Sequence, residues 1–174
     1  MFLIRYFPIL LLSIYTTCSY AQEGFMLGVG PTASSKSSLF GANARLYYGT
    51  SPRFCFGPEI SIFPFQSTED EVEEQLFEVN LNAHYLFELA HRFEFYPLTG
   101  INYTIETERS EIDLEEEEHT GTGINVGLGL HYSFGQVLVF SEFKSVIGEL
   151  NDEFFTLGTV IMLKKRGTEH SHND

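Results

Sequence analysis

Tryptophan is absent from this 174-residue sequence, and its 10 Lys and Arg are outnumbered by 24 Asp and Glu. The formal net charge of −14 argues against a nucleic-acid-binding protein, because phosphate binding requires clustered Lys and Arg. There is no phosphate-cradling glycine loop, CxxC or HExxH motif. After the N-terminal segment, no stretch approaches the roughly 18 apolar residues of a membrane-spanning helix. These absences argue against nucleotide-binding, thiol-redox, zinc-protease and helical membrane proteins.

The first 21 residues have the features of a secretory signal peptide. Arg5 supplies their only charge, "YFPILLLSIY" is a short apolar segment, and residues 19–21 fit a cleavage site. An uncleaved N-terminal anchor and a lipoprotein cut before Cys18 are the alternatives. Once this segment is removed, Cys55 is the only cysteine, which excludes an intramolecular disulfide.

Apolar and polar residues alternate along most of the remaining chain, which is rich in Phe (17) and Tyr (9). A period of two is typical of β-strands. Eight strands are expected, over residues 24–32, 38–48, 53–64, 76–87, 93–105, 122–132, 136–147 and 154–164. Most of them have the length that a tilted strand needs to cross a bilayer.

The connections between the expected strands alternate in length. Those after the second, fourth and sixth strands are short ("GTSPR", "LAHR", "SFGQ"), and those after the first, third and fifth are longer and polar. Outer-membrane barrels have this alternation, with turns in the periplasm and loops outside. We therefore predict an all-β fold over residues 22–164, an eight-stranded antiparallel up-and-down transmembrane β-barrel with short periplasmic turns and longer acidic extracellular loops. A polar C-terminal tail is expected at 165–174.

Aromatic residues gather at both ends of the apolar face of these strands. Those next to the short turns are Tyr48, Phe54, Tyr85, Phe87, Phe93 and Tyr132, and those near the long loops are Phe40, Phe77, Tyr103 and Phe155. Two aromatic belts are typical of the two membrane–water interfaces. The core of a soluble β-sandwich is the alternative, which the position of the aromatics at strand ends disfavours.

The eight-strand pattern, the "SYAQ" junction and the loop asymmetry resemble a known family. The chain is similar to small outer-membrane β-barrel proteins, namely the OmpA/OmpX-type transmembrane barrels and the PorT-like outer membrane protein beta-barrel group of Bacteroidota. The resemblance covers the predicted mature chain and rests on pattern rather than on a diagnostic motif. It implies an eight-stranded antiparallel barrel in the bacterial outer membrane, in a group whose members are mostly not enzymes.

The sequence departs from the family pattern at three positions. Such barrels usually end on an aromatic residue, whereas Leu163 occupies that place here. Pro58 and Pro97 lie within expected strands, where each removes a ladder donor. We therefore expect a bulge or a widely spaced position at each proline.

The segment "INVGLGLHYSFGQVLVFSEF" is expected to form the sixth and seventh strands. The expected register places Gly129 opposite Phe140, and Gly127 then lies opposite Glu142. These glycines would leave room for large inward side chains, the small and large complementarity that narrow barrels need.

Charged residues occupy the face that is expected to line the lumen. They are Arg45, Arg53, Glu59, Glu78, His84, Glu94, His131, Glu142 and Lys144. Charges inside an eight-stranded barrel must be paired or hydrated, and its lumen is just wide enough to be filled by side chains. A structural ion-pair network is therefore the preferred interpretation, with a gated ion path as the alternative. Glu142 and Lys144, adjacent on one face, are the first expected pair.

Two acidic stretches, 69–74 and 106–118, hold 13 of the 24 acidic residues. Solvated loops are the simplest interpretation. Divalent cations that bridge these stretches to lipopolysaccharide phosphates are a hypothesis, because Ca²⁺ and Mg²⁺ take oxygen ligands. The spacing of a calcium-binding loop is absent, so no metal site and no cofactor are assigned.

Three other functions fit parts of the sequence pattern. A secreted lipocalin-like barrel would have the same alternation with an apolar cavity inside and a polar surface outside. His131, Ser133 and Glu142 resemble the catalytic set of outer-membrane lipid A deacylases, although Phe134 follows the serine where that family has Asn. An accessory role in protein secretion is implied only by the PorT-like resemblance. The preferred prediction is a non-enzymatic outer-membrane barrel whose partners are outer-membrane lipid and lipopolysaccharide; the sequence identifies no protein partner.

Overall fold

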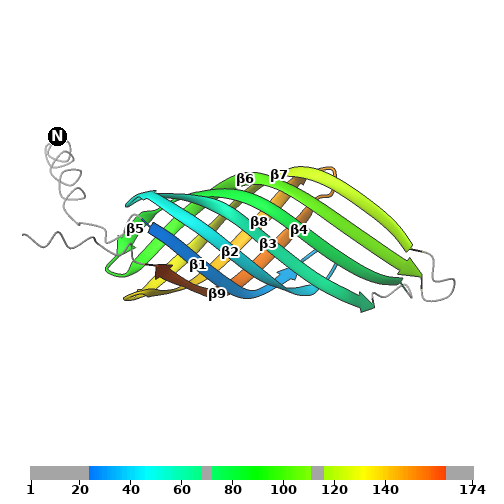
Figure 1. The fold of residues 1–174 in the computed structure, drawn as a ribbon, viewed down its shortest axis with the longest axis horizontal. Helices are drawn as coiled ribbons and strands as arrows, with labels where there is room; N and C mark the ends of the chain where they lie inside the picture. The colour runs from blue at the N-terminus through cyan, green and yellow to red at the C-terminus, as the bar shows by residue number, and fades with distance from the viewer. Residues whose placement is uncertain (1–23, 68–71, 111–115, 164–174) are drawn as a thin grey trace, which may run out of the picture.

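The computed structural model describes residues 24–67, 72–110 and 116–163. Almost all of them lie in β-strands that share a common tilt (Figure 1). The strands are β1 Gly24–Ser34, β2 Phe40–Ser51, β3 Phe54–Ser67, β4 Val72–Tyr85, β5 Phe87–Ala90, β6 Phe93–Ser110, β7 Glu116–Phe134, β8 Val137–Gly148 and β9 Asp152–Leu163. No helix within these ranges is long and apolar enough to cross a membrane. The predicted signal peptide and the predicted tail lie outside the described residues.

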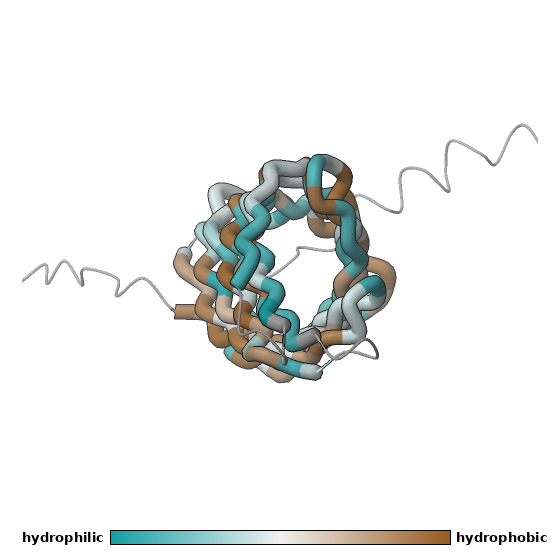
Figure 2. The backbone as a smooth tube through the Cα atoms, turned by 90° about the vertical axis from the view of Figure 1, so that its right-hand side faces the viewer, coloured by the Kyte–Doolittle hydropathy of each residue, from teal (hydrophilic) through white to brown (hydrophobic). Residues whose placement is uncertain are grey.

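The strands close into one antiparallel barrel. Strands that follow one another in sequence pair, except that β4 and β5 both pair with β6, and β1 pairs with β9 to close the sheet. β5 continues β4 along β6 in the same register, because His84 lies opposite Leu98 and Phe87 lies opposite Phe95. The nine strand segments therefore form the predicted eight-stranded barrel. Viewed from the end, the backbone forms a closed ring (Figure 2).

The two prolines interrupt the ladders without shifting their register. Pro97 on β6 faces the break between β4 and β5, where the N–H of Leu86 instead donates to the carbonyl of Arg53 at 2.8 Å. Pairing between β2 and β3 is skipped around Pro58 and resumes in the same register. Each proline leaves a gap toward one neighbouring strand only, because Pro58 still pairs with Leu81 and Pro97 with Leu128. Proline has no N–H to donate, which accounts for the gaps, and neither site is a bulge.

The turn between β7 and β8 is tighter than predicted. Phe134 pairs with Val137, so only Gly135 and Gln136 form the turn. Gly135 has a φ of 82°, and two-residue hairpins need positive φ in the turn.

This turn moves the β7–β8 register by two residues from the prediction. Gly129 lies opposite Glu142, and Gly127 lies opposite Lys144. The predicted pairings of Gly129 with Phe140 and of Gly127 with Glu142 were therefore wrong. A register shift of two residues leaves every side chain on the same face of its strand, so the same side chains face the lumen.

Four strands continue beyond the rim of the barrel, into segments that the sequence suggested were loops. Pairing of β6 with β7 runs unbroken to Arg109 opposite Glu116, and β4 pairs with β6 as far as Val72 opposite Ser110. We call residues 64–67, 72–75, 106–110 and 116–121 of β3, β4, β6 and β7 the acidic extension. Contacts between side chains stabilise the pairing of these strands. The Arg109 guanidinium forms an ion pair with Glu73 on the facing strand, and it lies 4.5 Å from the ring centroid of Phe65.

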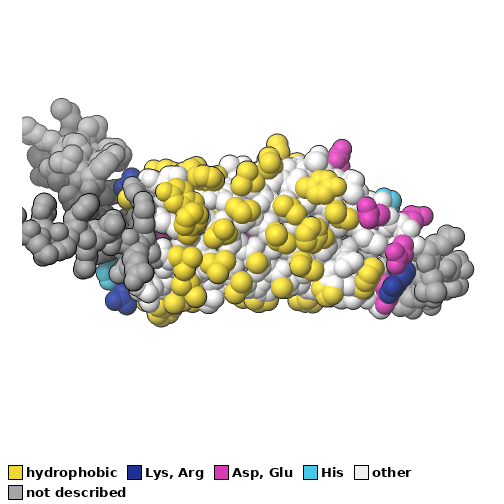
Figure 3. All heavy atoms as spheres, viewed as in Figure 1, with side chains coloured by type: hydrophobic (Ala, Val, Ile, Leu, Met, Phe, Trp, Pro, Cys, Tyr) yellow, Lys and Arg dark blue, Asp and Glu magenta, His cyan; other side chains and the backbone are white. Residues whose placement is uncertain are grey.

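The outer wall of the barrel is apolar. Large hydrophobic side chains on alternate positions of every strand are 37–71% exposed. They cover the middle of the molecule, and acidic side chains gather at the end that carries the acidic extension (Figure 3). The intervening inward positions hold most of the buried polar residues. This polarity is the reverse of a lipocalin, whose apolar residues line the cavity.

Candidate functional site

The lumen collects the charged side chains that the sequence predicted to face it. Arg45, Glu59, Glu78, Glu142 and Lys144 come from four different strands, and each residue is at most 3% exposed. Small residues face these long side chains. A Cβ on Gly28 would lie 2.8 Å from Cγ of Arg45. Glycines therefore make the space that the charged side chains occupy.

Arg45 is the centre of the network. Its Nη1 and Nη2 donate to the two carboxylate oxygens of Glu142 at 2.9 and 3.1 Å, across the lumen from β2 to β8. Its Nη2 also lies 3.2 Å from Oε2 of Glu59, and its Nε donates to Oδ1 of Asn43 at 2.9 Å. The guanidinium carbon lies 4.1 Å from the ring centroid of Phe140. A bidentate Arg–carboxylate pair fixes geometry as well as charge.

Lys144 connects two further carboxylates. Its Nζ lies 3.3 Å from Oε1 of Glu59 and 3.3 Å from Oε2 of Glu78. The predicted pair between Glu142 and Lys144 is not the main contact of either residue. Adjacent inward residues of one strand point in parallel, so each binds a partner on the facing wall instead.

Neutral polar side chains, which the pattern of charges did not predict, complete the network. The hydroxyls of Tyr47 and Tyr96 donate to Glu59 at 3.0 Å and to Glu142 at 2.9 Å. Asn102 donates to Oε1 of Glu78 at 2.9 Å and belongs to a cluster of buried amides. The other members of this cluster are Asn80, Asn82 and Asn125. Three fully buried carboxylates face two cations, and these neutral donors satisfy the remaining oxygens.

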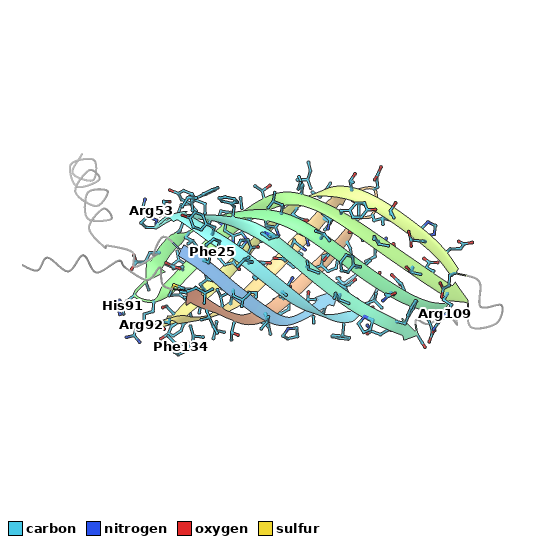
Figure 4. All side chains as sticks on the ribbon, in the orientation of Figure 1. Phe25, Arg53, His91, Arg92, Arg109 and Phe134 are labelled. Atoms are coloured by element: carbon cyan, nitrogen blue, oxygen red, sulfur yellow. The ribbon has the colours of Figure 1, made fainter. Side chains whose placement is uncertain are left out.

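The predicted histidines lie in a stack of rings on the periplasmic side of Arg45. The His84 ring lies between Tyr47 and Tyr96, with centroid distances of 4.5 and 4.6 Å. The His131 ring lies 4.4 Å from Tyr96, and its Nδ1 is 3.8 Å from Oε2 of Glu94. Arg53, also predicted inward, is instead exposed in the turn after β2, because β3 begins only at Phe54 (Figure 4).

Apolar clusters, which we call the apolar layers, flank the charges of the lumen on both sides along the barrel axis. The layer at the extracellular side consists of Leu39, Phe63, Leu76, Val146 and Phe154. The layers at the periplasmic side consist of Leu86, Tyr96 and Leu98, and of Leu138, Phe140 and Val160 with Met26 and Met162. The ion pairs are therefore enclosed between apolar side chains, in a low-dielectric setting that strengthens them.

The predicted interface aromatics lie on the outward face. Tyr48, Phe54, Tyr85, Phe87 and Tyr132 are 38–48% exposed at the periplasmic end, and Phe40, Tyr103 and Phe155 are 42–71% exposed at the other end. Phe77 and Phe93 are half-buried on the same face. Neighbouring rings contact one another, as in the pair Phe25 and Tyr48 with centroids 5.1 Å apart.

The acidic extension contains two neighbouring inward carboxyl groups, those of Glu74 and Glu106, because Leu76 lies opposite Glu106 and Glu74 lies opposite Glu108. Partial burial and the hydrogen bond to Glu74 raise the pKa of Glu106 to about 7, and the charge of Glu74 adds to this shift. Within the described ranges, the cations at this end are Lys36 and Arg109.

The possible catalytic set is not assembled. Both oxygens of Glu142 accept from Arg45, and the nearest carboxylate to His131 in an ion-pair geometry belongs to Glu94. Among the described residues, no group of three or more His, Cys, Asp or Glu is arranged to hold a metal ion.

An apolar wall around a filled, polar lumen, closed without a free sheet edge at membrane depth, defines a small outer-membrane β-barrel. A family model described as "Outer membrane protein beta-barrel domain" matches residues 9–141. The chain belongs to this family, and its place is the bacterial outer membrane.

Solved structures support the same fold. Ail, the attachment invasion locus protein of Yersinia pestis, is 12% identical with a TM-score of 0.59, over 82% of this chain and 100% of that one. The N-terminal β-barrel domain of Pseudomonas aeruginosa OprF is 17% identical with a TM-score of 0.63, over 82% and 100%. Neisserial surface protein A is 14% identical with a TM-score of 0.62, over 80% and 97%. Another Ail structure contains the heparin analogue sucrose octasulfate. No curated protein matches the chain.

Proposed function

We propose that this protein is a non-enzymatic outer-membrane barrel whose lumen is sealed by an ion-pair network, and that it acts through its acidic extracellular end. The observation that carries the seal is the bidentate pair between Arg45 and Glu142, which joins opposite walls between two apolar layers. A conducting pore needs hydrated charges, whereas these residues are at most 3% exposed. The interface aromatics anchor the barrel in outer-membrane lipid.

The acidic extension is the surface that we propose contacts other molecules. Its exposed or half-buried carboxylates are Glu73, Glu106, Glu108, Glu116, Glu117 and Glu118. This charge favours cationic partners, or anionic lipopolysaccharide phosphates only when divalent cations bridge the two. Arg109 is bound by Glu73 and faces Glu116, so it adds little free positive charge.

Ligand binding tests this part of the proposal. Sucrose octasulfate, the polyanion in the Ail complex, should not bind this barrel, whereas polylysine should bind and dissociate as salt is added. Light-scattering or calorimetric titration of the detergent-refolded barrel measures both. A variant with Glu116, Glu117 and Glu118 changed to Gln should lose most of the polylysine binding. Tight binding of sucrose octasulfate by the unchanged barrel would contradict the proposal.

A further inference from the structure

The acidic extension is a sheet with two edges, because the barrel strands on either side of it end earlier. Pairing of β2 with β3 ends at Ala42 opposite Ile62, and pairing of β7 with β8 ends at Gly123 opposite Gly148. Beyond these pairs the described strands lie in the order β3, β4, β6 and β7 (Figure 1). The edge of a sheet presents backbone N–H and C=O groups with which another chain can pair.

The β3 edge carries three features that prevent further pairing. Pro64 has no N–H to donate. The register of β3 against β4 shifts between Phe63 and Gln66, which marks a bulge. The Gln66 side chain accepts from the N–H of Phe40 at 3.0 Å and donates to the Phe40 carbonyl at 2.8 Å, so a side-chain amide takes the place of a neighbouring strand. Prolines, bulges and covered backbone groups are common protections of sheet edges.

The β7 edge has neither a proline nor a register shift at residues 116–121, and we call the side of these residues that faces away from β6 the open edge. Thr122 shows which backbone groups point to this side. Its N–H donates to the Glu149 carboxylate at 2.8 Å, and its carbonyl accepts from the Glu149 N–H at 3.1 Å. Because backbone direction alternates along an antiparallel strand, the N–H and C=O groups of Thr120 and Glu118 also point there. No described strand pairs with them.

The open edge is acidic and lies on the water side of the interface aromatics. Thr122 lies opposite Tyr103, so the residues before Thr122 lie beyond the outer aromatic belt. Glu116, Glu117 and Glu118 are exposed. Opposite charges on paired strands attract and like charges repel, so a second copy of this chain would bring further carboxylates to an edge that already has three. A cationic strand is the occupant that the charge favours.

We propose that the open edge binds an extended cationic segment of a partner protein, which adds to the sheet as an antiparallel strand beside β7. Main-chain hydrogen bonds to Thr120 and Glu118 supply affinity, and Lys or Arg at alternate positions supplies selectivity. Residues directly opposite Glu116 and Glu118 lie on the same face as these carboxylates, so cations are favoured there. The inference rests on the proposed function, because it gives the acidic extension a class of partner and a binding mode.

Short synthetic peptides in which Lys and Thr alternate test this mode on the full mature barrel, refolded in zwitterionic detergent. A Lys opposite Glu118 would form a hydrogen-bonded pair, so its own N–H would point at β7. Methylation of the Lys backbone nitrogens should therefore weaken binding at least about fivefold in a calorimetric titration, as expected for lost hydrogen bonds. The same peptide methylated on the Thr nitrogens is the matched control. It has equal charge and mass, and it should bind like the unmethylated peptide.

A variant of the barrel blocks the same edge without a change of charge. The Thr120 N–H points away from β6, so Thr120→Pro leaves the β6–β7 hydrogen bonds in place while its ring obstructs an added strand. This variant should bind the unmethylated peptide at least about fivefold more weakly, whereas Thr120→Ala should bind it normally. A shift in gel mobility on heating verifies that both variants are folded.

Amide hydrogen exchange, measured by NMR, reports the binding mode directly. The amides of Thr120 and Glu118 should exchange rapidly in the free barrel and slowly in the peptide-saturated barrel. The amides of Glu117 and His119 point to β6 and are the internal control. Unchanged exchange of Thr120 and Glu118 at saturation would overturn the proposal. Slow exchange that appears without peptide as the barrel concentration rises would also overturn it, because a second copy would then occupy the edge.

These outcomes are distinct from a failure of the proposed function. Polylysine binds through charge alone, so its binding to the acidic extension does not require a free strand edge. Equal binding of the two methylated peptides, with polylysine still bound, would overturn the strand addition and leave the cationic preference intact. Absence of polylysine binding would instead overturn the proposed function.

Discussion

Arg45 is the residue on which the lumen network depends most, because it neutralises Glu59 and Glu142 at once. Arg45→Met keeps much of the side-chain volume but leaves two buried carboxylates with fewer partners. Removing one member of a buried ion pair typically costs about 3–5 kcal/mol. We therefore expect a loss of that size in the free energy of unfolding, measured by urea titration of the lipid-reconstituted barrel.

The matched control for this variant is Arg53→Met. Arg53 is exposed in a turn, so its replacement should change stability by less than about 0.5 kcal/mol. Adding Glu142→Gln to Arg45→Met should recover part of the loss, since it removes one unpaired charge. Equal and small effects of both arginine variants would mean that the network does not stabilise the barrel.

Gly127 lies on β7 at a position where a side chain has no room. A Cβ at this position would lie 2.3 Å from the backbone oxygen of Phe143, so Gly127→Leu cannot be accommodated without moving the strand. We expect this variant to fail to assemble, seen as loss of the heat-modifiable band on unboiled gels. Val126→Leu is the control, because Val126 is 49% exposed on the lipid-facing side. Normal assembly of Gly127→Leu would contradict the close approach.

Individual residues were predictable from the sequence where polarity alone decides their face. Arg45 and Glu59 stand between apolar neighbours, and lipid excludes their charges. Apolar residues that face inward were not predicted, because alternation assigns such residues to the lipid. A local signal exists for some of them. Tyr47–Tyr48 and Phe154–Phe155 are consecutive aromatic pairs, so one ring of each must face the lumen.

At the scale of the strand, the sequence predicted the centres better than the ends. The apolar band fixes which residues cross the membrane, but beyond the band both faces are wet and the alternation fades. β6 extends to Ser110, and β7 begins at Glu116. These ends depend on the pairing of the two strands with each other, which the alternation of apolar and polar residues within one strand does not reveal. The β7–β8 register depends on the turn, which a two-residue geometry at Gly135 sets.

The acidic extension should respond to pH through Glu106. Its pKa is raised from 4.5 to about 7 by folding, so the folded extension holds this proton more tightly than the unfolded chain. Any stabilisation from this proton is complete below about pH 4.5 and is lost as the pH rises through about 7. In chelator, the thermal midpoint should fall between these pH values more for the unchanged protein than for Glu106→Gln. Identical pH profiles of the two proteins would contradict the shifted pKa.

The whole molecule has an asymmetric charge distribution. Carboxylates gather on the acidic extension, whereas Arg53 and Arg92 lie at the opposite end, beside the short turns (Figure 4). Strand count, topology and closure were predictable, because a protein that crosses a membrane with strands can satisfy its backbone in lipid only by closing into a barrel. The sequence predicted that paired charges fill the lumen. It did not predict which residues pair, because the contacts join strands that lie far apart in sequence.

The central claim is that the lumen is sealed, and electrical recording tests it most directly. The purified barrel should be inserted into planar lipid bilayers in concentrated KCl, with an open porin as the positive control. We predict insertion without stable conductance steps, because charged side chains of the lumen pair with one another between apolar layers. Reproducible, long-lived conductance steps from the unchanged protein would contradict the sealed lumen.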